Sequence, residues 1–377
     1  MRILMLGQRG IPATHGGVEK AVQEIAVRLA SRGHDVTVLC RSAYTPPMDS
    51  YEGVRIVRLP TIPQKNLDMI VHTFIGAIWS WFHGFDVVHL HGVDPAIVSP
   101  LMSWRHRLVV TSHGRAYLRD GWGAIPRAVS KFAERVFLAW PQVRTAVSKT
   151  LCDYYRTVGG REIRYVPNGV TVGPKQDEGL VRALGLDPAQ YVLCVGRVDP
   201  AKGVHLIVEA FLREDRGELK LAIIGDVSRN DDYIKELRLH EGERVVFLGH
   251  REGDVLKALY DHCRLFVLPS YAEGLPMVLL EALASRCELV YSDLPPNVEV
   301  AQGLGRAFRC GDADDLADTL NRALEQPQGN EQSAERIAFR LREYDWDCVV
   351  DSYLDSYRQA VERRSVTIAT PDGDASE

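Results

Sequence analysis

Paired cysteines, long apolar runs and familiar nucleotide fingerprints are scarce in this sequence. Its seven cysteines are scattered and form no CxxC pair, which argues against a disulfide framework or a zinc cluster and favours a reducing cytoplasm. The most apolar window, residues 69–82, is interrupted by His72 and Thr73 and is shorter than the ~20 residues that span a bilayer. The opening MRILMLG lacks the regions of a signal peptide and predicts a first strand.

The composition is otherwise that of a folded protein. A chain of 377 residues with 46% hydrophobic and 25% charged residues predicts two domains, each with its own core. The net charge of -5 divides unevenly, because residues 1–170 carry 21 Lys+Arg against 12 Asp+Glu and residues 171–377 carry 24 against 38. A basic first half favours anionic partners such as phosphorylated ligands or acidic lipid headgroups; an uneven solvated surface is the alternative.

Short Val/Ile/Leu runs alternate with amphipathic stretches in both halves, a pattern typical of βαβ units around parallel sheets. In the first half we expect strands at 2–6, 35–40, 54–59, 87–90, 108–111 and 143–146, with helices at 18–32, 67–82 and 126–138. A turn-rich segment, residues 168–179, interrupts the pattern, which restarts at 191–196. The sequence therefore predicts an α/β fold with two doubly wound domains, followed by helices and a polar tail.

Two glycine-containing loops each follow an expected strand and precede an expected helix. In GQRGIPATHGGVEK, Gly16 and Gly17 can present backbone N–H groups to an anion, although the loop is neither GxGxxG nor a Walker motif and could serve packing alone. In GRVDPAKG, Arg197 and Lys202 flank a short turn where they could neutralise a diphosphate. A solvated basic loop is the plainer interpretation of that second stretch.

The stretch YAEGLPMVLLEAL carries two carboxylates around an apolar run. Because Pro276 suits the first turn of a helix, we expect a helix over Leu275–Leu283, with Glu273 just before it and Glu281 about two turns along. Free N–H groups at the helix start would face an anion, and the acids could accept hydrogen bonds from hydroxyls on either side of it. The pattern suits a nucleotide sugar, although acids near helix starts are also common for dipole reasons alone.

Taken in order, these motifs resemble the signature of retaining glycosyltransferases of family 4, and the resemblance spans nearly the whole chain. The segments QRGIPATHGGVE, HLHG, TSHG and PNGV also resemble bacterial rhamnosyl- or polysaccharide-building members. The resemblance implies the GT-B fold, in which two facing Rossmann-like domains bind the acceptor and the nucleotide donor, and C-terminal helices cross back to the first domain. The expected boundaries are an acceptor domain at 1–168, a donor domain at 169–343, a returning helix at 344–364 and a disordered tail at 365–377.

The resemblance also implies roles for individual residues. Arg197 and Lys202 would hold the donor diphosphate, Glu273 would contact hydroxyls of the transferred sugar, and Glu281 would hold the ribose. His113, in TSHG, matches the histidine that approaches the donor sugar and completes the implied catalytic set with Arg197, Lys202 and Glu273. The remaining donor-binding positions are Gly16, Gly17, Gly196, Gly274, Leu275, Pro276, Met277 and Val278, the last standing where many relatives have Thr or Ser.

Acceptor contacts are assigned from position. His91 follows a strand, and Arg115 and Tyr117 follow TSHG, where an acceptor would bind; a strand-capping histidine and a solvated loop are the alternatives. Glu19 or Asp94 could deprotonate the acceptor, but acids in a first helical turn are commonly structural. The acidic cluster DVSRNDD lacks the spacing of a metal site, and the Arg/Lys pair supplies the charge that Mg²⁺ would bring, so no metal is expected.

The substrates are left open at this stage. A UDP-, dTDP- or GDP-linked sugar is the expected donor, with no cofactor required and no nucleic-acid partner, and the expected mechanism is front-face attack with retention. The acceptor is a saccharide or lipid-linked saccharide of cell-envelope or exopolysaccharide synthesis, or alternatively a small natural product such as an aminocyclitol. A nucleotide-sugar epimerase of the same fold is a further alternative.

Membrane contact is the last open question. We expect a cytoplasmic protein, and one interpretation of Trp79, Trp81 and Phe82 with the basic first half is peripheral docking to an acidic membrane surface. The other is that these aromatics pack a core helix.

Overall fold

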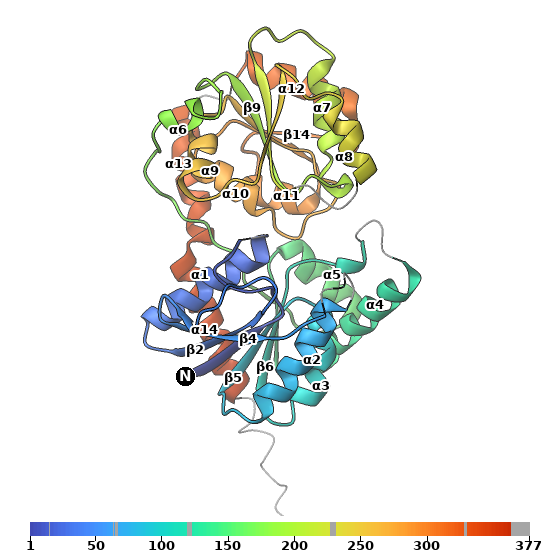
Figure 1. The fold of residues 1–377 in the computed structure, drawn as a ribbon, viewed down its shortest axis with the longest axis vertical. Coiled ribbons are helices and arrows are strands. Elements are labelled where there is room, and N and C mark those ends of the chain that lie inside the picture. The colour runs from blue at the N-terminus through green and yellow to red at the C-terminus, as the bar shows by residue number, and fades with distance from the viewer. Residues whose placement is uncertain are drawn as a thin grey trace, which may run out of the picture. The chain divides into compact units, whose positions relative to one another are not determined.

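The computed structural model describes the chain apart from His15, Pro63, Lys65, Asn66 and residues 119–122, 227–230, 328–329 and 363–377. The expected disordered tail and most of the DVSRNDD cluster therefore lie outside the described residues. The chain forms two compact units, each with its own sheet (Figure 1). Within the described residues, the first consists of residues 1–117, 123–169 and 346–362, and the second of Leu118 and residues 170–345.

The sheet of the first unit has eight strands in the order β3-β4-β2-β1-β5-β6-β7-β8. Neighbouring strands run parallel, except that β3 is antiparallel to β4. Six of the strands match the expected ones to within one residue, whereas β3 and β8 are two-residue strands that carry no apolar run. The strands are β1 Arg2–Leu6, β2 Asp35–Arg41, β3 Ser50–Tyr51, β4 Val54–Leu59, β5 Val87–His91, β6 Arg107–Ser112, β7 Val143–Ala146 and β8 Arg164–Tyr165.

Helices accompany this sheet, and the last of them comes from the far end of the chain. The helices are α1 Gly17–Ser31, α2 Asp68–Trp81, α3 Ser99–Met102, α4 Ala124–Ala139, α5 Lys149–Gly159 and α14 Trp346–Glu362, with 3-10 turns η1 Asp94–Val98 and η2 Ala116–Leu118. α14 packs against α1, β6 and β7. Arg32, the C-cap residue of α1, pairs with Asp347 at 2.7 Å and Asp351 at 2.6 Å, and the Tyr353 and Tyr357 side chains are fully buried. These contacts make the C-terminal helix part of the first unit.

The second unit has a six-stranded parallel sheet in the order β11-β10-β9-β12-β13-β14. Its strands are β9 Tyr191–Val195, β10 Lys220–Ile224, β11 Val245–Gly249, β12 Leu265–Leu268, β13 Leu289–Ser292 and β14 Arg306–Phe308. Its helices are α6 Gly179–Arg182, α7 Val204–Leu212, α8 Asp231–Arg238, α9 Gly253–His262, α10 Met277–Ala284, α11 Pro295–Ala301, α12 Ala313–Glu325 and α13 Asn330–Leu341, with η3 Pro200–Lys202 and η4 Arg342–Tyr344. The expected α/β architecture with two parallel sheets is confirmed.

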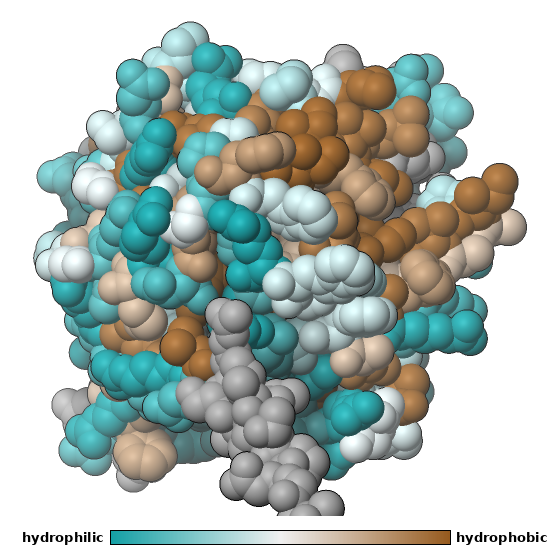
Figure 2. Space-filling model, turned by 90° about the horizontal axis from the view of Figure 1, so that it is seen from below, coloured by the Kyte–Doolittle hydropathy of each residue, from teal (hydrophilic) through white to brown (hydrophobic). Residues whose placement is uncertain are grey.

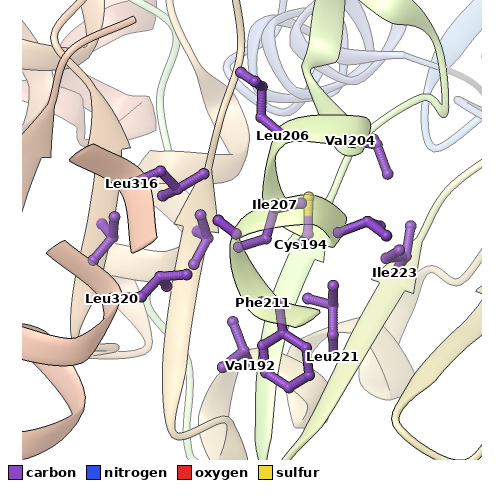
Figure 3. Packing of buried hydrophobic residues seen from close by; sticks show 14 of the residues in the cluster. Val192, Cys194, Val204, Leu206, Ile207, Phe211, Leu221, Ile223, Leu316 and Leu320 are labelled. Atoms are coloured by element: carbon purple, nitrogen blue, oxygen red, sulfur yellow. The ribbon is translucent and has the colours of Figure 1, made fainter. Parts of the chain in front are cut away.

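The core of the second unit lies between its sheet and the helices α7 and α12 (Figure 3). β9 contributes Val192 and Cys194, α7 contributes Ile207 and Phe211, and Leu316 of α12 completes the contact. All five side chains are almost completely buried. Burying an aliphatic or aromatic side chain of this size stabilises the fold by about 1.5–3 kcal/mol each. The carboxyl ends of the central strands are therefore fixed in place by dense packing beneath them.

Each sheet has one strand at which the strand order reverses. In the first sheet β1 lies between β2 and β5, and in the second β9 lies between β10 and β12. Loops that leave the carboxyl ends of two such neighbouring strands diverge and open a crevice, which is where open α/β sheets bind ligands. Expected site residues follow the strands at these points: Gly16 and Gly17 come after β1, Lys202 after β9 and Glu273 after β12. No helix within the described part of the chain is long and apolar enough to cross a bilayer.

Candidate active site

Lys202 and Glu273 meet at the switch point of the second sheet. Lys202 ends η3, after β9, and Glu273 lies in the loop after β12. The Lys202 ammonium Nζ donates a hydrogen bond to Glu273 Oε1 at 2.6 Å, with 23% and 8% of the two side chains exposed. The two loops approach closely because Gly203 has φ 66°, and a Cβ there would lie 2.1 Å from the carbonyl oxygen of Pro269. Only glycine fits that position.

Arg197 takes a different partner. Its guanidinium pairs with Asp199 at 3.1 Å, and 59% of its side chain is exposed. The sequence analysis did not assign Asp199 a role, although it stands only two residues along the same loop. The structure therefore joins Lys202 to Glu273 and leaves Arg197 at the rim of the loop, where an exposed guanidinium pair contributes little to stability.

The helix after Glu273 begins later than expected. α10 starts at Met277, and Pro276 is its N-cap residue with φ −77° and ψ 94°. The expected helix over Leu275–Leu283 is therefore wrong at its start, because Leu279 and Leu280 both donate their backbone N–H to the Pro276 carbonyl. The N–H groups of Met277 and Val278 belong to the first turn and have no partner within the helix. Two of the predicted backbone donors thus stand at a helix start, near Glu273 in sequence.

Glu281, on α10, is held by a tyrosine of the neighbouring helix α9. Tyr260 donates its hydroxyl to Glu281 Oε2 at 3.1 Å. Burial, and then the neighbouring carboxylate, raise the pKa of Tyr260 well above its usual value, so the phenol keeps its proton and remains a donor. Sequence reasoning missed Tyr260, since a tyrosine 21 residues upstream carries no local signal of this contact.

A hollow of about 430 Å³ between α7 and α8, lined by His205 and His240 among others, includes none of the predicted donor-binding residues.

The corresponding edge of the first sheet is lined by histidines. His91 ends β5 and His113 follows β6, and His91 Nδ1 lies 3.3 Å from His113 Nε2. Burial lowers the pKa of His113 to about 4 and that of His91 well below its usual value. Both rings are therefore neutral at pH 7, and one must donate its N–H to the bare nitrogen of the other. A Cβ at Gly7, which has φ 112°, would lie 2.4 Å from the His91 carbonyl oxygen, so only glycine fits beside His91 at this position.

A third imidazole supports this pair from within the sheet. The ring of His89 lies 3.8 Å from that of His91, centroid to centroid. His89 Nδ1 is 2.8 Å from the Tyr357 hydroxyl of α14, and its Nε2 is 2.6 Å from Thr111 Oγ1. The C-terminal helix therefore contributes to the positioning of the histidines. Sequence reasoning selected His91 and His113 and missed His89, although His89 stands two residues before His91 on β5.

Two family models divide the chain between them. Residues 15–173 match the model described as "Glycosyltransferase Family 4", and residues 178–339 match "Glycosyl transferases group 1". The chain is a GT-B glycosyltransferase. The expected GT-B fold and the resemblance to glycosyltransferases are confirmed.

Relatives and solved structures agree. Glycogen synthase of Mycobacterium tuberculosis is 28% identical to this chain, and the match covers 96% of this chain and 95% of that synthase. Phosphatidyl-myo-inositol mannosyltransferase of Mycobacterium leprae is 27% identical over 91% and 92%. Sucrose-phosphate synthase from Thermosynechococcus elongatus has the same fold, with a TM-score of 0.84 at 20% identity and coverage of 96% and 99%. Anabaena HepE in complex with UDP and glucose gives 0.79 at 20% identity, with coverage of 95% and 99%.

The residues expected to contact the acceptor fall into two groups. Glu19 accepts a hydrogen bond from the Arg9 backbone N–H at 3.2 Å, so it secures the glycine loop. Arg115 lies over the Tyr154 ring at 4.3 Å, and the Tyr117 hydroxyl is 2.6 Å from that of Tyr154. Both stand in a packed cluster and not in a solvated loop. Their contact with an acceptor stays a prediction, as does that of Glu19.

This cluster is anchored by a buried acid. Tyr154 donates to Glu134 Oε1 at 3.1 Å, and burial raises the pKa of the Glu134 carboxyl. Asp94, the other candidate base, accepts a hydrogen bond from Ser130. Within the described residues, no three His, Cys, Asp or Glu side chains gather as a metal site would require.

Proposed function

We propose that this glycosyltransferase moves a hexose-type sugar from a nucleotide diphosphate sugar to a hydroxyl of a saccharide or lipid-linked saccharide, with retention and without a required metal. The observation that carries the proposal is the half-buried Lys202–Glu273 pair at the switch point of the second sheet. It combines, in one place, a cation for a phosphate and an acid for sugar hydroxyls. The UDP-linked, dTDP-linked and GDP-linked sugars are the candidate donors.

The chemistry follows from where charge develops. As the glycosidic bond breaks, negative charge grows on the departing diphosphate, so the catalytic effect required is stabilisation of that charge. Lys202, Arg197 and the N–H groups at the start of α10 would supply it. Glu273 would hold hydroxyls of the transferred sugar and Glu281 those of the ribose. Gly16, Gly17 and Gly196 would let backbone approach the phosphates.

Retention is proposed to proceed by front-face attack. A double displacement needs a carboxylate free to attack the reacting carbon. Of the two acids around α10, Glu273 is engaged by Lys202 and Glu281 by Tyr260. The departing diphosphate would then take the acceptor's proton, and His113, as the family resemblance implies, would approach the donor sugar.

Relatives support the choice of substrates. Anabaena HepE structures contain UDP, UDP and glucose, or UDP-glucose, which favours a UDP-linked donor. The names glycogen synthase and phosphatidyl-myo-inositol mannosyltransferase favour a saccharide or a lipid-linked acceptor. D-inositol 3-phosphate glycosyltransferase of Nocardia farcinica, 27% identical, favours a second candidate, a small cyclitol acceptor. For a lipid-linked acceptor we propose peripheral contact with an acidic membrane surface at the cytoplasmic side.

The proposal can be tested with the purified chain. A panel of UDP-, dTDP- and GDP-sugars is screened for the one that raises the melting temperature, since a ligand that binds only the folded state stabilises it. That donor is then incubated with saccharide, lipid-linked and cyclitol acceptors in the presence of EDTA, and the product is analysed by NMR. An α-linked product from an α-linked donor is expected. An inverted anomer, or donor epimerised without an acceptor, would contradict the proposal.

A further inference from the structure

Helix α2 of the first unit has an unusual distribution of buried and exposed side chains. The side chains that it buries are polar or small: Asp68, His72, Thr73, Gly76, Ala77 and Ser80. The side chains that it exposes are large and apolar: Phe74, Ile78 and Trp81, with Phe82 and Leu67 at its ends. A surface helix ordinarily shows the opposite arrangement. Packing within the chain does not explain why these large apolar side chains face solvent.

Close packing on the sheet explains the inner face. A Cβ at Gly76 would lie 3.0 Å from Cδ1 of Leu6 and of Leu39, so at this position the helix approaches the strands too closely for a larger side chain. Packing by aromatics into a core, one of the two interpretations of this stretch, is therefore wrong for Trp81 and Phe82. Phe82 is 80% exposed. Trp79 is partly buried and stacks on His83.

Helix α4 continues the exposed surface next to α2. Both helices contact η1 and α3, and Trp81 Nε1 donates to the Leu101 carbonyl of α3. Ile125, Phe132 and Trp140 of this region are exposed, and so is Trp104 after α3. In Figure 2 apolar residues gather on the side of the molecule where α2, α3 and α4 lie in Figure 1. Apolar surface this contiguous marks an interaction site in a folded protein.

The exposed charges on α4 are all of one sign. Arg127, Lys131 and Arg135 are exposed, whereas the only acid of the helix, Glu134, is buried. Arg105, beside Trp104, adds a further exposed cation. We call the exposed side chains of α2 and α4, together with Phe82 directly after α2, the docking face. It combines protruding apolar groups with cations, which is the composition of helices that lie in the interface of an anionic bilayer.

A second copy of the chain fits this face poorly. A twofold contact would place the cations of one α4 near those of the other, and like charges across an interface oppose association. A lipid surface imposes no such opposition, and its fluid interior accommodates single protruding side chains without shaped pockets. The charge of the face therefore favours an anionic lipid surface over self-association.

We propose that the docking face seats the glycosyltransferase on an anionic bilayer, with Phe82, Ile78 and Phe132 entering the interface and the cations of α4 against the lipid headgroups. This rests on the lipid-linked acceptor of the proposed function and deepens it by assigning the surface that reaches the acceptor. Each cation near such a surface strengthens binding about fivefold. An apolar side chain of this size adds at least about tenfold.

Vesicle binding of the full chain tests the proposal. Co-sedimentation is measured with phosphatidylcholine vesicles with and without phosphatidylglycerol, at low and high salt. Binding is expected only with phosphatidylglycerol, and salt should weaken it. Phe82→Asp should weaken it at least about tenfold and Lys131→Glu at least about fivefold. Helix α13 supplies matched controls: Phe339→Asp, at a 73% exposed site, and the exposed Arg336→Glu should leave binding unchanged.

Any of four outcomes would overturn the proposal. The wild-type protein could bind neither kind of vesicle, or bind both equally, or the α13 variants could lose as much binding as the docking-face variants. The fourth is a concentration-dependent dimer in light scattering that Phe82→Asp abolishes, which would assign the face to a second copy. Transfer to a soluble saccharide acceptor is measured in parallel. Vesicle binding without any transferase activity would refute the proposed function and leave the docking face standing.

Discussion

The two switch points of this glycosyltransferase have similar strands beneath them but differ in the charge of the side chains that meet there. At the second sheet, the loops after β9 and β12 meet through a charged pair, Lys202 and Glu273. At the first sheet, the ends of β5 and its neighbour β6, next to the switch point, meet through two neutral imidazoles, His91 and His113. The strands beneath are alike, parallel and buried. The fold therefore provides the place, and the loops decide which ligand chemistry it suits.

The difference in charge has a physical basis. A lysine ammonium held by a carboxylate places a cation at the second switch point, where it can attract the phosphates of a nucleotide. An imidazole buried among other imidazoles has no acid to stabilise its proton, so its pKa falls. A neutral edge suits hydroxyls of a sugar better than phosphates. This agrees with the proposed division into a donor unit and an acceptor unit.

The largest effect is expected from removing the cation of the second switch point. Lys202→Ala should lower kcat about 10²–10³-fold, because the charge on the departing diphosphate loses its partner. Binding of the nucleotide, measured by calorimetry, should weaken far less.

The chain offers a matched control for this variant. Lys257 forms an equally short pair with Asp261 at 2.7 Å, with side chains 25% and 3% exposed, but on α9. Lys257→Ala should cost stability and leave kcat unchanged. Equal losses of kcat in both variants would show that the charge comparison has no catalytic meaning.

The neutral histidines of the first unit predict acid sensitivity. Burial, and then the charge of Arg41, lower the pKa of His72 to about 4. Below the ordinary value near 6.5 the unfolded chain takes up a proton that the folded state refuses, so stability falls as the pH drops from 6.5 towards 4. This amounts to about 2 kcal/mol at pH 5 for this one group. Urea unfolding at pH 7.5 and pH 5.0 measures it.

His72→Leu should reduce this dependence on pH, and the exposed His240→Gln should leave it as it is. A wild-type free energy of unfolding that is the same at both pH values would contradict the assignment of neutral, buried histidines.

A moderate effect is expected from separating the two imidazoles. His91→Leu removes the contact that orients His113, and kcat should fall about tenfold, since small misplacements of a site group are costly. His106, another buried histidine, lies 3.1 Å from the Ser80 carbonyl through its Nε2. His106→Leu is the control and should change the melting temperature alone. If both variants lose kcat alike, His91 acts through stability.

The smallest effect concerns the partner of Glu281. Tyr260→Phe keeps the ring and removes the donor, so the carboxylate loses one hydrogen bond worth about 1 kcal/mol. Nucleotide affinity should weaken about fivefold with kcat preserved. A change of kcat without a change in affinity would place Glu281 away from the ribose.

Much of the fold of this protein could be predicted from short stretches of the sequence. The period of Val54–Leu59 and Val143–Ala146 predicts those strands at their observed bounds, because alternation and β-branching act within a few residues. Short edge strands such as Ser50–Tyr51 were missed, since pairing with a neighbour defines them and no apolar run marks them. The start of α10 was placed two residues early, because proline suits both the N-cap seen here and the first helical turn.

The sequence by itself determined the order of strands and helices, the family motifs and the candidates Lys202, Glu273, His91 and His113. These depend on residue type and spacing along the chain. Only the tertiary structure decided that Lys202 pairs with Glu273, that Tyr260 holds Glu281 and that His89 lies against His91. It also decided which side of α2 faces solvent, because tight packing of Gly76 on Leu6 and Leu39 overrides the preference of large apolar side chains for the interior. Such contacts join residues distant in sequence, and their energies exist only once the sheets have assembled.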